Sequence, residues 1–177
     1  MYRLRLTQVP DNGTLQEDGL VLGAPEFGLS GAFLGADVEF GFELQRRMER
    51  VYGQVWAAAQ ASLTCGRCLK DYQEKLSTEF PIMFVPRPET VGQDGDPEDP
   101  ELSVAFFDGE DLPLGEEIRQ ELELRLPFAP LCRPDCKGLC TVCGQDRNDS
   151  DCGHHPAGTS GAFSALNDLF HPKKEGA

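Results

Sequence analysis

The sequence lacks any run of apolar residues long enough to cross a membrane, which takes about 20 residues as a helix. Its first residues, MYRLRLTQVPDNG, alternate apolar and polar side chains and lack the continuous apolar stretch of a secretion signal. Positive charge is also scarce, because 16 Lys and Arg side chains face 30 Asp and Glu side chains, for a net charge of −14. We therefore expect a cytoplasmic protein without a membrane partner.

The excess negative charge is concentrated in the middle of the chain. Residues 85–131 carry 13 acidic and 3 basic side chains, whereas residues 1–84 and 132–177 have net charges of only −3 and −1. Proteins bind nucleic-acid phosphates mainly through Lys and Arg, so direct RNA binding is allowed but not favoured by the net charge. The acidic middle is interpreted first as a solvated loop, and second as a surface for a basic protein partner such as a ribosomal protein.

Recognisable catalytic patterns are absent from the sequence as well. It contains no Ser/His/Asp set, no glycine-rich loop that would cradle a phosphate, and no pair of carboxylates that can be assigned to acid–base catalysis. These absences favour a protein that is not an enzyme.

What the sequence does contain is a concentration of cysteine. Thiols stay reduced in the cytosol, and seven cysteines cannot all pair in disulfides, so metal binding is favoured. A structural zinc ion takes four sulfur or nitrogen ligands, and eight candidates therefore predict two zinc ions, or one if a set is incomplete. The eight candidate ligands are Cys65, Cys68, Cys132, Cys136, Cys140, Cys143, Cys152 and His154.

The sequence leaves two groupings of these ligands open. In the favoured one, Cys65 and Cys68 join Cys132 and Cys136, and residues 140–154 close a second site on their own with little loss of chain entropy. In the other grouping, Cys65 and Cys68 join Cys140 and Cys143. His155 is adjacent to His154 and is an alternative eighth ligand.

Other cysteine chemistries are weaker interpretations of the same residues. An iron–sulfur cluster also uses four thiolates. A redox-active CxxC usually precedes a helix in a βαβ unit, whereas strands are predicted on both sides of Cys65 and Cys68. A catalytic zinc keeps one open position, and eight ligands for two ions leave none.

The pattern of apolar residues predicts an α+β fold: a mostly antiparallel β-sheet with one long helix and a cysteine-rich, zinc-stabilised C-terminal region. Strands are expected at 2–9, 38–44, 51–57, 59–65 and 71–85, with loops from about 10 to 35 and a short strand at SVAFFD. The CGRC turn then lies at the tip of a hairpin.

We expect two regions that form one cooperative domain. Residues 1–131 form a β-rich core with an acidic loop at about 86–111 and a helix at about 113–126. Residues 132–177 form a zinc-knuckle region in which SGAFSALNDLF makes a short C-terminal helix.

The motifs around the cysteines resemble those of the bacterial YceD family, also called large ribosomal RNA subunit accumulation protein. The similar segments are CGRCL at 65–69, LPFAPLC ending at Cys132, and DCKGLC-xx-CG at 135–144, followed by Asn148 and Cys152. The resemblance covers most of the chain from about residue 35. Two features depart from the family: its NLN-like run is QDRN here, and its final CxC is Cys152-Gly-His154.

This resemblance implies a non-enzymatic ribosome biogenesis factor that promotes accumulation of large-subunit (23S) ribosomal RNA and contains structural zinc. The implied partners are ribosome-assembly intermediates or a basic ribosomal protein. The alternatives are a zinc-dependent enzyme acting on RNA or protein, and a thiol redox switch at Cys65 and Cys68.

Overall fold

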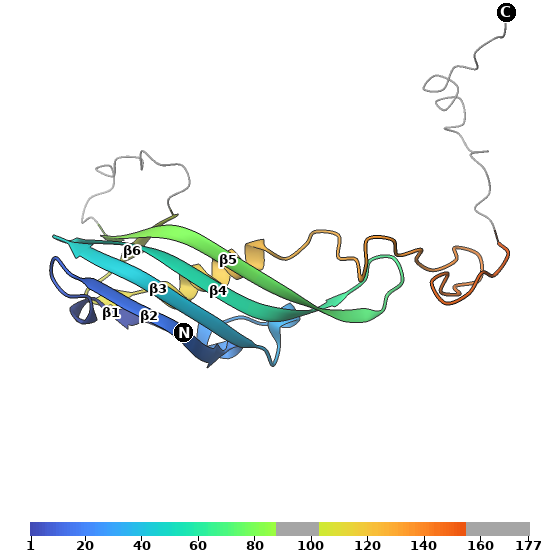
Figure 1. Ribbon diagram of the computed structural model, residues 1–177, viewed down its shortest axis with the longest axis horizontal. Helices are drawn as coiled ribbons and strands as arrows, with labels where there is room; N and C mark the ends of the chain where they lie inside the picture. The colour runs from blue at the N-terminus through green and yellow to red at the C-terminus, as the bar shows by residue number, and fades with distance from the viewer. Residues whose placement is uncertain (88–102, 155–177) are drawn as a thin grey trace, which may run out of the picture.

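The computed structural model describes residues 1–87 and 103–154. Its main element is a five-stranded sheet in the order β2-β3-β4-β5-β6 (Figure 1). Strands β2 to β5 pair antiparallel, and β6 pairs parallel with β5. The strands are Thr14–Gly23 (β2), Asp37–Arg47 (β3), Arg50–Thr64 (β4), Asp71–Pro86 (β5) and Ser103–Phe107 (β6).

Within the described ranges there is one α-helix, α1 (Leu114–Leu124). The prediction of a mostly antiparallel sheet with one helix is therefore confirmed. A two-stranded ribbon, β1 (Leu4–Arg5) and β7 (Asp111–Leu112), fastens the N-terminus beside the start of this helix. This helix is too short to cross a membrane, and the described segments contain no helix that is long and apolar enough to do so.

The hydrophobic core lies between one face of the sheet and a layer made by α1 and short 3₁₀ turns at Ala24–Phe27 and Gly31–Phe33. Leu114, Ile118 and Leu122 recur on one side of the helix and are fully buried, as their spacing predicts. From the sheet, alternate residues point into the same layer because the side-chain period of a strand is two. The largest fully buried side chains of strands β3 and β5 are Phe40, Phe42, Leu44, Ile82 and Phe84.

The structure corrects the sequence interpretation near the N-terminus. Residues 2–9 do not form one strand, because the chain turns into a 3₁₀ helix at Leu6–Gln8 directly after β1. The predicted loop from 10 to 35 contains β2, a full edge strand. A shift in pairing between Glu17 and Leu20 reverses the phase of the apolar positions within β2, which hides the period-two pattern from the sequence.

Other boundaries also differ from the predictions. Residues 50–64 form one continuous strand rather than two, and the helix is two residues shorter at its C-terminal end than predicted. The predicted acidic loop at about 86–111 includes the end of β5, all of β6 and the start of β7, while residues 88–102 of it lie outside the described part of the chain. The predicted helix at 160–170, His155 and His171 also lie outside it.

The hairpin of β4 and β5 positions the cysteines. These two strands pair from Val51 and Phe84 in the core to Thr64 and Asp71 at the far end. The hairpin reaches past the rest of the sheet, and the chain beyond α1 runs alongside it to the cysteine-rich region (Figure 1). The six residues of the tip therefore lie beside residues far along the sequence.

Replacing Gly53 with Ala should be strongly destabilising, because there is no space for a methyl group. A Cβ atom at this position would collide with the Glu43 carbonyl oxygen and would lie 2.5 Å from Leu44 Cδ2. We expect a loss of about 3 kcal/mol in the free energy of unfolding, measured with urea. Gly23→Ala is the control, because its nearest neighbour is Pro25 Cδ at 3.6 Å. Equal stability of the two variants would contradict this packing argument.

Glu117 on α1 should make the fold less stable as the pH rises. Burial, together with the nearby carboxylates of Glu116 and Glu121, raises the pKa of Glu117 from 4.5 to about 7. The folded protein thus holds this proton more tightly than the unfolded chain, and stability is lost between about pH 4.5 and pH 7.

The variant Glu117→Gln removes this titration. We expect the free energy of unfolding of this variant to exceed that of the native protein by about 1 kcal/mol at pH 8 and by little at pH 4. The difference is modest because the side chain is partly exposed and solvent screens its charge. Urea unfolding at both pH values measures the difference, with the exposed Glu49→Gln as control. A gain that is the same at both pH values would show that the effect is not electrostatic.

Candidate metal centre

The tip of the hairpin, residues 65–70, is shaped by backbone hydrogen bonds that present two sulfurs. The N–H of Cys65 donates to the Lys70 carbonyl at 2.9 Å, and the N–H of Leu69 donates to the Cys65 carbonyl at 3.0 Å. The N–H of Gly66 donates across to the carbonyl of Pro130, on the segment that follows α1, at 2.8 Å. The tip is therefore tied to the chain that carries the next two cysteines.

The hairpin cluster consists of Cys65, Cys68, Cys132 and Cys136, which meet although they come from separate parts of the chain. The Sγ atoms of Cys65 and Cys136 are 3.8 Å apart, and those of Cys68 and Cys132 are 3.6 Å apart. All four sulfurs lie within 4.8 Å of one another, and three of the four residues are buried. Four ligands 2.3 Å from a tetrahedral zinc ion would be about 3.8 Å apart, so the geometry fits this ion.

The ionisation of these thiols also suits a cation. Backbone N–H groups of Cys132 and Cys68 lower the pKa of the Cys65 thiol to about 6, because they stabilise its thiolate. Burial and the neighbouring sulfurs raise the pKa of Cys132 to about 12. One thiolate thus forms readily and opposes the ionisation of the next. A divalent cation would offset this repulsion, which is why thiol clusters and metal ions stabilise each other.

The loop cluster consists of Cys140, Cys143, Cys152 and His154, whose ligand atoms also lie within 4.8 Å of one another. Cys140 is buried, and the N–H groups of Cys143 and Val142 lower the pKa of its thiol to about 6. Cys143 and His154 are exposed. Gly144 has a φ of 75°, a conformation that favours glycine, and its N–H returns to the Cys140 carbonyl at 2.9 Å.

All eight candidate ligands therefore meet in two groups of four, in the first of the two arrangements considered from the sequence. Each group could hold a metal ion. The two groups differ in exposure: three of the four residues of the hairpin cluster are buried, whereas Cys143 and His154 of the loop cluster are exposed.

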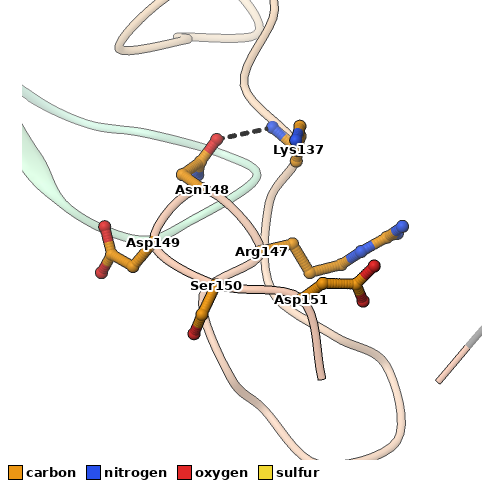
Figure 2. A pocket seen from close by; sticks show the side chains of 6 residues that line it. All are labelled: Lys137, Arg147, Asn148, Asp149, Ser150 and Asp151. Atoms are coloured by element: carbon orange, nitrogen blue, oxygen red, sulfur yellow. Dashed lines mark hydrogen bonds between the residues drawn. The ribbon is translucent and has the colours of Figure 1, made fainter. Parts of the chain in front are cut away.

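Sequence reasoning did not identify the polar residues that surround the sulfurs. Asn148 Nδ2 lies 3.4 Å from Cys136 Sγ, and Asn148 Oδ1 accepts from the Lys137 N–H at 2.8 Å (Figure 2). Lys70 Nζ forms an ion pair with Asp146 at 2.8 Å. No sequence signal other than the position of Asn148 in the family-like motif pointed to these contacts.

Arg67 lies between the two cysteines of the hairpin tip. Its guanidinium donates to the Cys136 carbonyl oxygen at 2.9 Å, and its own carbonyl accepts from the Leu139 N–H at 3.0 Å. Arg67 thus fastens the hairpin tip to the backbone around Cys136 and places a positive charge beside the hairpin cluster.

The part of the chain that matches a known family contains both clusters. Residues 54–170, which include all eight candidate ligands, match the family of the large ribosomal RNA subunit accumulation protein YceD. The chain belongs to the YceD family. The matched region begins within β4 and takes in the hairpin, α1 and the cysteine-rich segment.

More distant relatives come from mycobacteria. Uncharacterized proteins of Mycobacterium bovis and of two Mycobacterium tuberculosis strains are 27% identical to this YceD family member over 141 residues, or 80% of its length. The match spans 66% of the length of those relatives. No solved structure matches the chain significantly.

Removing one ligand from each cluster should separate their contributions to stability. Cys136→Ser and His154→Ala should each bind one zinc ion fewer than the native protein, as measured by elemental analysis. Cys136→Ser should lose more stability, because a hairpin-cluster ion links residues 71 positions apart whereas the loop cluster closes within residues 140–154. Loop-closure entropy alone predicts a difference of about 1.4 kcal/mol in urea unfolding.

A strong chelator provides the complementary measurement. It should release close to two zinc ions per chain and loosen the fold around the hairpin tip. Metal-free protein with unchanged unfolding would contradict a structural role for the ions.

Proposed function

We propose that this protein binds one zinc ion in each cluster and acts as a non-enzymatic factor in the accumulation of large-subunit ribosomal RNA. The family match carries the proposal, because the matched residues include the hairpin tip and both clusters. The proposed ligands are those of the hairpin cluster and the loop cluster, with His154 as the eighth. Zinc suits the donor set, since thiolates and imidazole in groups of four are its usual structural ligands.

The charge of the molecule supports partners that are proteins rather than bare RNA. Exposed or partly exposed carboxylates line α1, and the chain as a whole carries a net charge of −14. Ribosomal RNA would be repelled by such a surface, whereas a basic ribosomal protein in an assembly intermediate would be attracted to it. We propose that the protein acts at this stage, in the cytoplasm, by contact with such a partner.

We also propose that residues 1–131 and 132–177 form one cooperative unit. Contacts across this boundary include the hydrogen bonds from the Leu139 N–H to the Arg67 carbonyl and from the Arg67 guanidinium to the Cys136 carbonyl, and the sulfurs of the hairpin cluster. An ion in the hairpin cluster would connect the two regions more strongly than these hydrogen bonds alone.

Depletion of the protein in its own organism should lower the ratio of large to small ribosomal subunits and reduce mature 23S ribosomal RNA. We expect the native gene to restore both, and a Cys65→Ser/Cys68→Ser variant to fail. The measurements are sucrose-gradient profiles and quantification of ribosomal RNA, with Ser150→Ala as a control outside the ligand set. Normal subunit ratios after complete depletion would overturn the proposed role.

Purification of the tagged protein distinguishes the type of partner. Large-subunit precursors and basic ribosomal proteins should co-purify and remain bound after nuclease treatment. Tight binding to naked ribosomal RNA that weakens steeply with salt would instead show that RNA is the direct partner.

A further inference from the structure

The segment between Cys143 and Cys152 belongs by sequence to the loop cluster. We call residues 144–151 the bridging loop. Both of its ends are fixed by candidate ligands of the loop cluster, so an ion bound there closes the loop and restricts its conformations. One polar side chain of the loop, that of Asn148, nevertheless contacts the hairpin cluster, and Asp146 and Asp149 contact Lys70 beside it.

Asn148 makes the most direct of these contacts. Its Nδ2 atom lies 3.4 Å from the sulfur of Cys136, a hairpin-cluster residue, and also donates to Asp146 Oδ1 at 2.7 Å. Its Oδ1 atom accepts from the Lys137 N–H at 2.8 Å and from the Arg133 guanidinium at 2.7 Å. Both ends of the amide are therefore held, and an N–H group is directed at a metal-ligating sulfur.

A second set of contacts fixes the bridging loop to the hairpin tip. Lys70, two residues after Cys68, forms ion pairs with Asp146 at 2.8 Å and Asp149 at 3.1 Å. The Arg147 N–H donates to the Gly138 carbonyl at 2.9 Å. A small hollow of about 160 Å³ is lined by Lys137 and residues 147–151. Figure 2 shows the Asn148 side chain directed toward the Lys137 backbone.

We propose that the bridging loop couples the two clusters, so that an ion in the loop cluster raises the affinity of the hairpin cluster for its own ion. Asn148 is the positioning residue that transmits the effect. This inference rests on the proposed zinc binding. It adds that occupancy of the exposed loop cluster sets how tightly the buried hairpin cluster holds its metal.

The physical reason is preorganisation. An ion in the loop cluster holds residues 144–151 in the conformation in which Asn148 donates to Cys136, so the buried thiolate gains a hydrogen bond without a further entropic cost. Removing such a partner of a metal ligand typically weakens metal binding about 10- to 100-fold. Because coupling between binding sites is reciprocal, an ion in the hairpin cluster strengthens binding at the loop cluster by the same factor.

The test measures metal affinity of the hairpin cluster in the full-length protein. Cobalt(II) distinguishes four-thiolate from three-thiolate–imidazole coordination by its absorption, and a chelator of known affinity then competes for zinc at each site. The variants are Cys143→Ser, which disables the exposed cluster, Asn148→Ala, which leaves all eight ligands in place, and the two combined. Ser150→Ala is the control on the same loop, since its hydroxyl contacts only Gln145 among the hydrogen bonds of the described residues.

We expect Cys143→Ser and Asn148→Ala each to lower the zinc affinity of the hairpin cluster about tenfold. The double variant should bind zinc at this cluster no more weakly than either single variant. Asn148→Asp should weaken it further, because it directs a carboxylate oxygen at the sulfur. Ser150→Ala should have no effect. Circular dichroism and the fluorescence of Trp56 report whether each variant is folded.

If Cys143→Ser leaves the zinc affinity of the hairpin cluster unchanged, the coupling is overturned while the proposed zinc binding stands. If the losses of zinc affinity from the two single variants add up in the double variant, Asn148 acts independently of the loop cluster. This result would also reject the coupling. A native protein that binds no zinc in either cluster would instead overturn the proposed function itself.

Discussion

The convergence of four sulfurs between the hairpin tip and the segment after α1 is the constraint on which the C-terminal part of the structure depends. Cys65 and Cys68 are presented by a long hairpin, whereas Cys132 and Cys136 follow the helix, so the two pairs meet only when the core is folded. Burial and the neighbouring sulfurs raise the pKa of the Cys132 thiol, and a cation among the four sulfurs would offset this effect. Short backbone hydrogen bonds from Gly66 and Leu139 then set the path of the chain around the sulfurs.

After Cys136, the described part of the chain has few buried apolar side chains that could hold it in place. Cys140 is buried and Leu139 pairs with the tip through its backbone, but Val142 and Cys143 are exposed. Charged and polar contacts replace a hydrophobic core: Lys70 with Asp146, Arg67 with the Cys136 carbonyl, and Asn148 with its four neighbours. Small regions of this kind usually need a metal or a disulfide for stability.

Much of the fold and the membership of the two clusters could be predicted from the sequence, because both leave local signals. Strands β3 and β5 show period-two alternation, α1 shows its apolar stripe, and CxxC spacing marks sulfurs that can share an ion. Strand β2 was missed, since its bulge reverses the alternation midway. The contacts of Lys70, Asp146 and Asn148 could not be predicted either, because they join loops that only tertiary folding brings together, and isolated polar residues have no periodicity.

The unbroken hairpin of β4 and β5 has a mechanical consequence. With 15 and 16 residues, these strands span about 50 Å at the usual rise of a strand. The two strands are paired along their length, so that one end of the hairpin lies in the hydrophobic core and the other end carries Cys65 and Cys68 of the hairpin cluster. A small rotation of the core therefore becomes a large displacement of the cysteine-bearing end of the hairpin.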